Sequence, residues 1–295
     1  MKGFSATAAV LLLLMVSCQQ NNNPVDLNST VSTHVQSEAV SDTYMSESQD
    51  MSSQVMNSTS ETLSGRSSET SREVKGMGDI DDRFKCAVVT HTKDPNSTPD
   101  KPLGTITIDF GTGCRDGHGN TRRGMIIITY SGRRFMPGSQ WVTTFRDFYR
   151  NDVKVEGVHT VSNISPTLQD YPKFHIVIAG GKLTFPDGRT ATREQDMTRE
   201  WQRASNPTQD KWIVDGIASG TNRNGKSYTM EITKSLVYSR ACEISNKVFI
   251  PVEGIKVLRV DGRVITIDYG DGTCDNKVTV TINGVTSEET LADKG

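Results

Sequence analysis

The chain has 295 residues, enough for one large domain or two ordinary ones and too many for a disulfide-held miniprotein. Its 33 basic and 35 acidic side chains leave a net charge of −2, so the charge of the whole chain indicates no particular partner. A hydrophobic content of 34% and a mean hydropathy of −0.46 predict a folded part diluted by a polar, unfolded part. The one apolar run lies at the N-terminus, which excludes a multi-pass membrane protein.

Residues 1–18 have the pattern of a bacterial lipoprotein signal. Lys2 gives a positive start, and residues 4–16 are an apolar stretch too short to span a bilayer. The stretch ends in Met15-Val16-Ser17-Cys18, which resembles a lipobox, although Met15 departs from the usual leucine. An ordinary secretory signal with an incidental cysteine is the alternative. The lipobox predicts removal of residues 1–17 and lipidation of Cys18 with acyl chains such as palmitate, enough for stable membrane anchoring.

Residues 18–78 read as a polar linker between this anchor and a folded body. Ser, Thr, Asn, Gln, Met and Glu dominate the segment, and Tyr44 is its only aromatic residue. Such a composition cannot bury enough apolar area to offset the entropy of ordering. We therefore expect a disordered stalk whose average reach, for a flexible coil of this length, is roughly 40–50 Å.

The sequence pattern of residues 79–295 is typical of β-strands. Period-two alternation predicts strands at 105–110, 124–130, 141–148, 153–161, 173–178, 228–233, 264–269 and 277–282. Asp-Gly or Asn-Gly pairs stand at 187–188, 224–225, 261–262 and 283–284, and such pairs favour type I′ hairpin turns. The predicted fold class is all-β: an antiparallel meander of about 12–16 strands, built as an elongated sheet or a sandwich.

Charge is distributed unevenly along the chain. Residues 19–78 hold three basic and eight acidic side chains, a net charge of −5, whereas residues 115–203 hold 14 basic and nine acidic ones, a net charge of +5. The central excess has two interpretations: an anion-facing surface, or the solvated face of long strands. The second is favoured.

Two Cys-containing units, at about 84–130 and 240–290, repeat one pattern on either side of a central meander. The segment from Thr105 to Cys114 parallels the segment from Ile265 to Cys274, and each is preceded by a second cysteine, Cys86 or Cys242. An internal duplication favours the disulfides Cys86–Cys114 and Cys242–Cys274, each worth roughly 3 kcal/mol. A four-thiolate zinc site is the poorer alternative, because no Cys-x-x-Cys pair exists.

The motifs that could indicate catalysis or metal binding are weak in this chain. Asp109-Phe110-Gly111 lacks the other kinase signatures, so it reads as a strand end running into a turn. Asp268, Asp271 and Asp275 stand among glycines, but hairpin turns explain them better than a calcium site. No metal site and no cofactor are expected.

Histidines and carboxylates leave an enzyme as an open alternative. His118, next to Asp116, is the most suggestive histidine but has no nucleophile motif, and His159 and His175 fit within strands. A glycan hydrolase could use strand-borne carboxylates that leave no local signature. The candidates are Glu194, Asp196 and Glu200.

Aromatic residues interleave with arginines at 141–150 and again near Trp201 and Trp212. This arrangement can bind sugars or anionic polymers. The favoured interpretation places the alternate aromatics Trp141, Phe145 and Tyr149 in the core.

Four blocks carry a resemblance to known proteins: Ile106 to Cys114, Lys182 to Gly188, Gly220 to Tyr228, and Asp268 to Asn276. Together they resemble uncharacterised all-β lipoproteins of Gram-negative, Bacteroidetes-type bacteria, over most of residues 80–290. The resemblance implies an outer-membrane-anchored, all-β protein and supplies no activity.

The sequence thus predicts a lipid-anchored cell-envelope protein with a non-enzymatic binding or structural role. Its expected partners are the membrane, through the lipid, and a glycan or an envelope protein, with no nucleic acid. A glycan-degrading envelope hydrolase with paired carboxylates is the alternative. Whether the body faces the periplasm or the cell surface is open.

Overall fold

A computed structural model describes residues 27–62, 71–117 and 119–291, with side chains in the first segment described from 33 to 58. Cys18 and His118 lie outside these residues. The helices are α1 (Leu27–Thr62), α2 (Met77–Ile80) and α3 (Arg240–Asn246), with 3₁₀ turns η1 (Asp82–Phe84) and η2 (Pro207–Gln209). The strands are β1 (Ser71–Glu73), β2 (Val88–Lys93), β3 (Leu103–Asp109), β4 (Cys114–Arg115), β5 (Thr121–Ser131), β6 (Gln140–Arg150), β7 (Val153–Asn163), β8 (Lys173–Thr184), β9 (Thr190–Gln202), β10 (Lys211–Thr221), β11 (Ser227–Ser239), β12 (Glu253–Val260), β13 (Arg263–Asp271), β14 (Lys277–Ile282) and β15 (Val285–Thr290).

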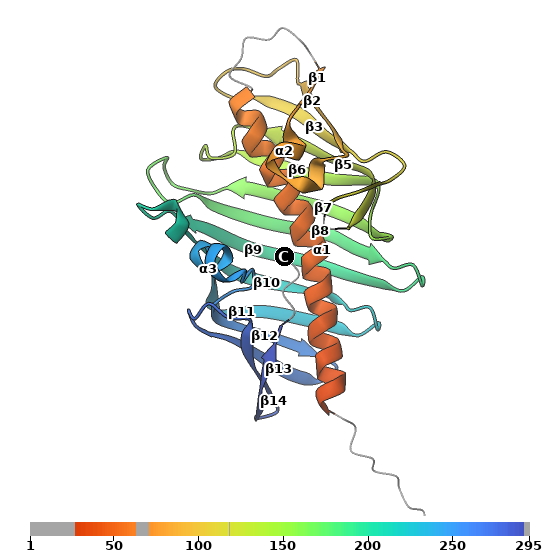
Figure 1. Ribbon diagram of the computed structural model, residues 1–295, viewed down its shortest axis with the longest axis vertical. Coiled ribbons are helices and arrows are strands. Elements are labelled where there is room, and N and C mark those ends of the chain that lie inside the picture. The colour runs from red at the N-terminus through yellow and green to blue at the C-terminus, as the bar shows by residue number, and fades with distance from the viewer. Residues whose placement is uncertain (1–26, 63–70, 118, 292–295) are drawn as a thin grey trace, which may run out of the picture.

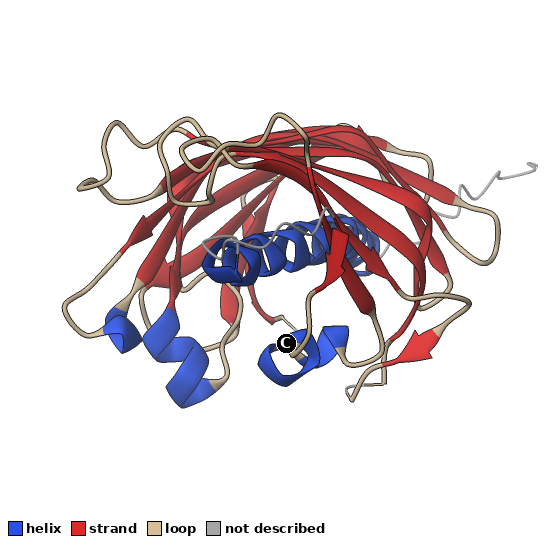
Figure 2. Ribbon diagram, turned by 90° about the horizontal axis from the view of Figure 1, so that it is seen from above, coloured by secondary structure: helices blue, strands red, loops and turns tan. Residues whose placement is uncertain are grey.

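All the strands belong to one 15-stranded antiparallel sheet in which neighbours in sequence are neighbours in space; the short β4 alone stands off the main path, beside β5. The predicted all-β meander is confirmed. The sheet curves into an arch, and α1 lies under the arch, running across the strands (Figures 1 and 2). Alternate side chains of each strand therefore point toward α1 on the concave face or toward solvent on the convex face. The core fills the space between the concave face and α1.

The hairpin turns follow the predicted chemistry at two of the four sites. Asp261 and Gly262 both have positive φ, as do Asn283 and Gly284, which is the type I′ pattern. At 187–188 and 224–225 only the glycine has positive φ. There the turn is one residue longer: Gly188 N–H donates to the Phe185 carbonyl at 2.9 Å, and Phe185 N–H donates to the Arg189 carbonyl at 2.9 Å. The type I′ expectation is wrong at these two turns, because glycine supplies only the final left-handed position.

The predicted disordered stalk at 18–78 is wrong for residues 27–62, which form the 36-residue helix α1. Its buried positions recur at alternating steps of four and three residues, so one stripe of the helix faces the sheet. That stripe consists of His34, Glu38, Ser41, Met45, Ser48, Ser52 and Val55, and Met51 and Met56 beside it are buried as well. Because most of its members are polar, the helix has no apolar periodicity to detect in the sequence.

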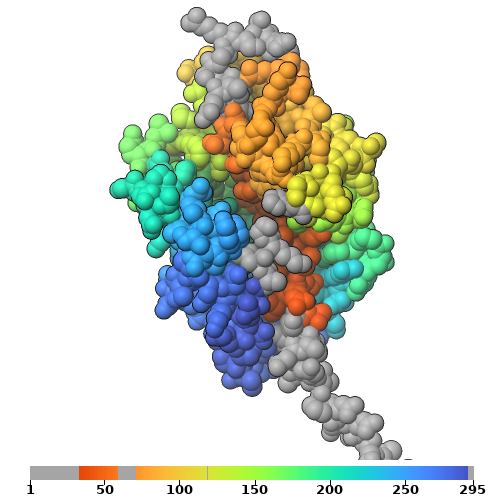
Figure 3. Space-filling view, in the orientation of Figure 1, coloured from red at the N-terminus to blue at the C-terminus, as the bar shows by residue number. Residues whose placement is uncertain are grey.

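Serine hydroxyls within the buried stripe are satisfied by the helix itself. Ser41, Ser48 and Ser52 each donate to the carbonyl four residues earlier, at 3.1, 3.1 and 2.9 Å. Each hydroxyl proton is therefore satisfied within the helix, Ser52 also accepts from the Thr143 hydroxyl of β6 at 3.0 Å, and the small side chains let α1 approach the sheet closely. The opposite side of α1 is exposed and forms a strip along the mouth of the arch (Figure 3).

Two disulfides stand near the two ends of the meander. Cys86 bonds to Cys114 across 28 residues, and Cys242 bonds to Cys274 across 32. In both units, the first cysteine precedes a hairpin, β2–β3 or β12–β13, and the second follows it. The predicted connectivity is the one that the structure has, and the four thiols are therefore not available as zinc ligands.

Candidate functional site

The most charged region of the interior lies where α1 meets the concave face. Five acidic residues and no lysine or arginine lie in α1, a net charge of −5. Four basic residues on the sheet reach toward them, and we call these four the basic floor. The basic floor is Arg122 on β5, Arg150 on β6, Arg193 on β9 and Lys256 on β12.

Glu38 is the centre of one buried ion cluster. Its carboxylate accepts from Arg193 Nη1 at 3.1 Å and from Lys256 Nζ at 3.0 Å, while Asp42 accepts from Arg193 Nη2 at 2.8 Å. Glu38 is 3% exposed and Arg193 is fully buried. Burial alone would raise the pKa of Glu38, but the charges of Lys256 and Arg193 outweigh it and lower the pKa to about 2. Two acids meet two bases, so the cluster is neutral.

Glu47, one and a half turns beyond Asp42, is the centre of a second cluster. Its carboxylate pairs with Arg122, and with Arg150 Nε at 2.6 Å. Arg122 also donates to Asp116 at 2.5 Å, and both side chains are almost fully buried. This cluster too joins two acids and two bases. Further along, Asp50 pairs with Arg83 of η1 at 2.7 Å, so four of the five acids of α1 have a basic partner.

The basic floor explains part of the excess positive charge at 115–203. The favoured expectation, a solvated strand face, is wrong for Arg122, Arg150 and Arg193, which point inward. The anion that these arginines face is α1. The clusters escape sequence reasoning because Glu38 and Arg193 are 155 residues apart in the chain. The signal that could reveal them is the complementary net charge of the two segments.

The aspartates of the second Cys-containing unit are turn residues, as predicted. Asp268 accepts from Gly270 N–H at 2.9 Å, Asp271 from Thr273 N–H at 3.3 Å, and Asp275 from Lys277 N–H at 3.1 Å. Asp109 likewise accepts from Gly111 N–H at 2.7 Å, at a strand end. Among the described residues, no three His, Cys, Asp or Glu side chains are grouped as metal ligands would be.

The carboxylates proposed for a hydrolase lie on β9 and have local partners. Glu194 accepts from Gly180 N–H at 2.9 Å, and Asp196 accepts from His175 Nε2 at 2.8 Å. Glu200 lies 3.9 Å from the Lys173 ammonium. All three point away from α1, on the side of β9 opposite Arg193.

The two described histidines of the central strands differ sharply. His175 is partly exposed beside Asp196, an ordinary strand-surface contact. His159 is fully buried on the concave face, where its ring meets Phe145 edge-on at 5.1 Å. Neither ring nitrogen of His159 has a partner among the described residues, and burial lowers its pKa to about 4.

The aromatic residues of β6 are core residues, with one exception. Trp141 is 1% exposed and Phe145 packs against the core, as predicted. Tyr149 was expected in the core, but it lies beneath the Arg123 guanidinium, 3.3 Å from the ring centroid to Cζ, beside a shallow surface hollow. The cause is a β-bulge between Thr143 and Tyr149, which shifts the alternation so that the neighbouring Phe148 points inward.

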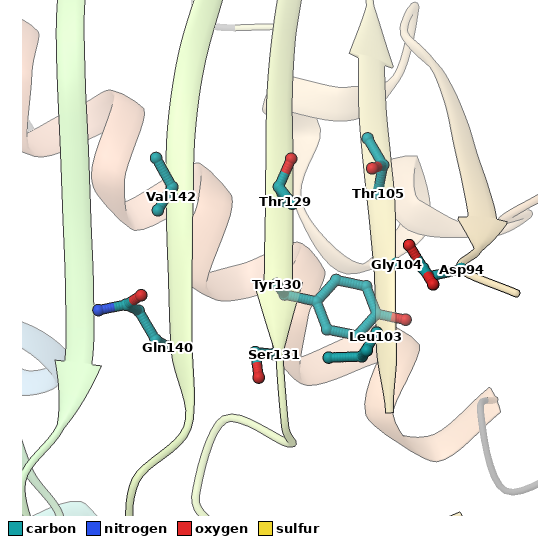
Figure 4. A pocket seen from close by; sticks show the side chains of 9 residues that line it. All are labelled: Asp94, Leu103, Gly104, Thr105, Thr129, Tyr130, Ser131, Gln140 and Val142. Carbon is teal, nitrogen blue, oxygen red and sulfur yellow. The ribbon is translucent and has the colours of Figure 1, made fainter. Parts of the chain in front are cut away.

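Another shallow hollow lies where β3, β5 and β6 run side by side (Figure 4). Thr105, Thr129 and Val142 form a row across the three strands, and Asp94 is the only charged residue of its lining. Beside them the Tyr130 ring extends over β3, and its hydroxyl lies 2.7 Å from His91 Nε2. A Cβ at Gly104 would lie 2.7 Å from this hydroxyl, so glycine is required there. The lining offers no acid–base pair.

The length and apolarity of the helices decide whether one of them could span a membrane. Among the described residues, no helix combines the length and the apolarity that a membrane span needs.

Comparison of the chain with known protein families, with curated proteins and with solved structures gives no match. The fold and its charged interior define the protein as an all-β meander that arches over an internal acidic helix.

Proposed function

We propose that this protein is a lipid-anchored cell-envelope protein with a non-enzymatic binding or structural role, in which α1 joins the anchor to the body. The observation that carries the proposal is the seating of α1. The helix that follows the predicted lipidation site packs inside the sheet through two neutral ion clusters. The segment next to the anchor is therefore part of the folded body.

This arrangement limits how far the body stands from the membrane. Eight residues separate Cys18 from Leu27, where α1 begins. A fully extended chain of that length spans at most about 30 Å. An anchor attached this closely holds the body near the membrane surface, which suits a role in presenting the sheet to envelope partners.

The carboxyl groups with a perturbed pKa lend no support to the hydrolase alternative. A glycosidase needs an acid whose pKa is raised, so that it is protonated near neutral pH. Hydrogen bonds and nearby cations lower the pKa of six described carboxyl groups instead. These groups are Glu38, Asp81, Asp116, Asp187, Asp261 and Asp271.

Lipidation is tested by labelling cells with a palmitate analogue and separating their membranes. We expect the wild-type protein to carry the label and to sediment with the outer membrane. The Cys18→Ala variant should lose the label and leave the membrane fraction. A wild-type protein without label would overturn the lipid anchor, whatever the body binds.

The role of the body is tested with the purified full chain. We expect no release of reducing sugar from envelope polysaccharides. Turnover that Glu194→Gln or Asp196→Asn abolishes would instead establish the hydrolase. Protease treatment of intact and lysed cells then reports which face of the outer membrane carries the body.

A further inference from the structure

A ladder of aromatic rings crosses the inner side of the sheet beside α1. Phe174 lies 6.2 Å from Phe135, Phe135 lies 5.6 Å from Trp201, and Trp201 stacks on Trp212 at 5.4 Å, all between ring centroids. Trp141 joins the ladder at Phe174, at 5.9 Å. Phe135, Trp201 and Trp212 are partly exposed, so this end of the ladder reaches solvent.

Two arginines lie against this ladder. The Arg199 guanidinium covers the Trp212 ring at 4.3 Å, and the Arg134 guanidinium lies 4.9 Å from the centroid of Phe135 and 5.8 Å from that of Phe174. In the strand register, Arg199 stands directly opposite Phe174. The same group of rings thus holds both cations, and both side chains are partly exposed.

Neither cation has a carboxylate within ion-pair distance among the described residues, although Asp50 attracts Arg134 from further away. Arg134 donates to the Ser53 carbonyl of α1 at 3.1 Å, and no described carboxylate forms an ion pair with Arg134 or Arg199. The Nε atoms of both are buried without a hydrogen-bond partner. Burial together with the like charge of Arg199 lowers the pKa of Arg134 to about 10. Elsewhere on the concave face, by contrast, each residue of the basic floor forms an ion pair with a carboxylate.

We propose that Arg134 and Arg199 form a binding site for an oxyanion, a carboxylate or phosphate group, borne by an acidic glycan. Stacking on an aromatic ring leaves the in-plane N–H groups of a guanidinium free, and these match the geometry of an oxyanion. The Trp212 ring contacts both Trp201 and the Arg199 guanidinium, so the rings hold this arginine in place. The glycan as source of the anion rests on the proposed envelope function, whereas the oxyanion site itself does not.

Tryptophan fluorescence reports directly on this site, since the three tryptophans of the chain, Trp141, Trp201 and Trp212, all belong to the ladder. The full chain is titrated with glucuronate, with glucose 6-phosphate and with inorganic phosphate. Glucose, and chloride at matched ionic strength, are the controls. We expect a saturable change with the oxyanions that the controls do not give.

Variants separate binding from structure. Arg199→Gln should weaken oxyanion binding by about tenfold or more, whereas Arg133→Gln, an exposed neighbour with the same charge change, should leave it within about twofold. Arg199→Gln should also raise the midpoint of thermal unfolding without ligand, because it removes one of two neighbouring like charges. A purely structural arginine would lower the midpoint.

The outcomes distinguish the two proposals. Saturation by phosphate compounds but not by glucuronate supports the site and identifies a phosphorylated source. Responses that equal those of chloride, or that survive Arg199→Gln, overturn the site. Lipidation of Cys18 is measured independently, so either proposal can fail while the other stands.

Discussion

Glu38 is the residue on which the seating of α1 depends most. Replacing Glu38 with Gln leaves Lys256 and Arg193 buried with only Asp42 to neutralise them. Removing one partner from a buried ion cluster costs about 3–5 kcal/mol, because the remaining charge is uncompensated. We therefore expect Glu38→Gln to lower the free energy of unfolding by that amount in urea denaturation.

Asp50→Asn is the matched control for this variant. Asp50 also lies on α1 and also pairs with an arginine, but its side chain is 55% exposed. Exposed pairs contribute about 0–1 kcal/mol, so a small loss is expected. The double variant Glu38→Met, Lys256→Met keeps the Asp42–Arg193 pair and should recover most of the stability. Equal losses in Glu38→Gln and Asp50→Asn would contradict a buried cluster.

His159 makes the stability depend on pH in a window of its own. The native state keeps this histidine neutral, with a pKa of about 4, whereas the unfolded chain binds a proton below the ordinary value of 6.5. Stability therefore falls as the pH is lowered from 6.5 to 4, by roughly 3 kcal/mol from this group. Glu38, whose pKa is lowered to about 2, contributes above pH 4.5, and its contribution is lost mainly below this window.

The variant His159→Leu should flatten the stability curve between pH 6.5 and 4. A residual slope will remain, because burial also lowers the pKa of His34 and of His91. Phe145→Leu, which changes packing against His159 but adds or removes no titrating group, should shift the whole curve without changing its shape. A slope unchanged by His159→Leu would refute the assignment.

At the scale of elements, α1 is a helix whose buried side includes three serines. Ser48 is 2% exposed, and its hydroxyl is bonded to the Tyr44 carbonyl. Ser48→Ala should change the free energy of unfolding by less than about 1 kcal/mol, since alanine favours helix and the lost bond is local. Ser48→Leu must displace the sheet or the helix and should cost about 1–3 kcal/mol. If both variants unfold alike in urea, α1 is not packed closely against the sheet.

The strands of the sheet could be predicted from sequence, and α1 could not. Alternation and glycine turns are local signals, and they located strands such as β3, β13 and β14 within a few residues. In α1 the buried stripe carries His34, Glu38 and serines, so hydropathy marks the segment as disordered. Its stabilising partners, such as Arg193, are distant in the chain and become recognisable only when the sheet is folded.

The proposed Arg134–Arg199 site also depends on contacts between residues that are distant in the chain. The sequence places Trp201 and Trp212 beside arginines, but it does not say which arginine stacks on which ring. The β9–β10 register sets Trp201 opposite Trp212, and the turn before β6 brings Phe135 to them from far along the chain. Aromatic–arginine proximity was therefore predictable, whereas the lack of an ion-pair partner for these arginines among the described residues was not.

At the scale of the whole molecule, α1 reaches across the arch and ties separate parts of the meander together. His34 accepts from Asn222 at the β10–β11 turn, 3.0 Å away, and Ser52 meets Thr143 on β6 at 3.0 Å. An element that bridges distant strands makes their unfolding depend on one another.

Limited digestion distinguishes this integrated helix from a free tether. Proteinase K cuts unfolded chain with little regard to sequence, so a disordered stalk would be removed first and would leave an intact body beginning near residue 71. With α1 seated under the arch, we expect residues 33–58 to resist cleavage as long as the sheet does, as followed by mass spectrometry. Glu38→Gln should shorten that protection, because local opening of α1 becomes easier. Early loss of residues 33–58 from the wild-type chain would show that the sheet stays folded without its helix. It would support the flexible stalk that the sequence predicts.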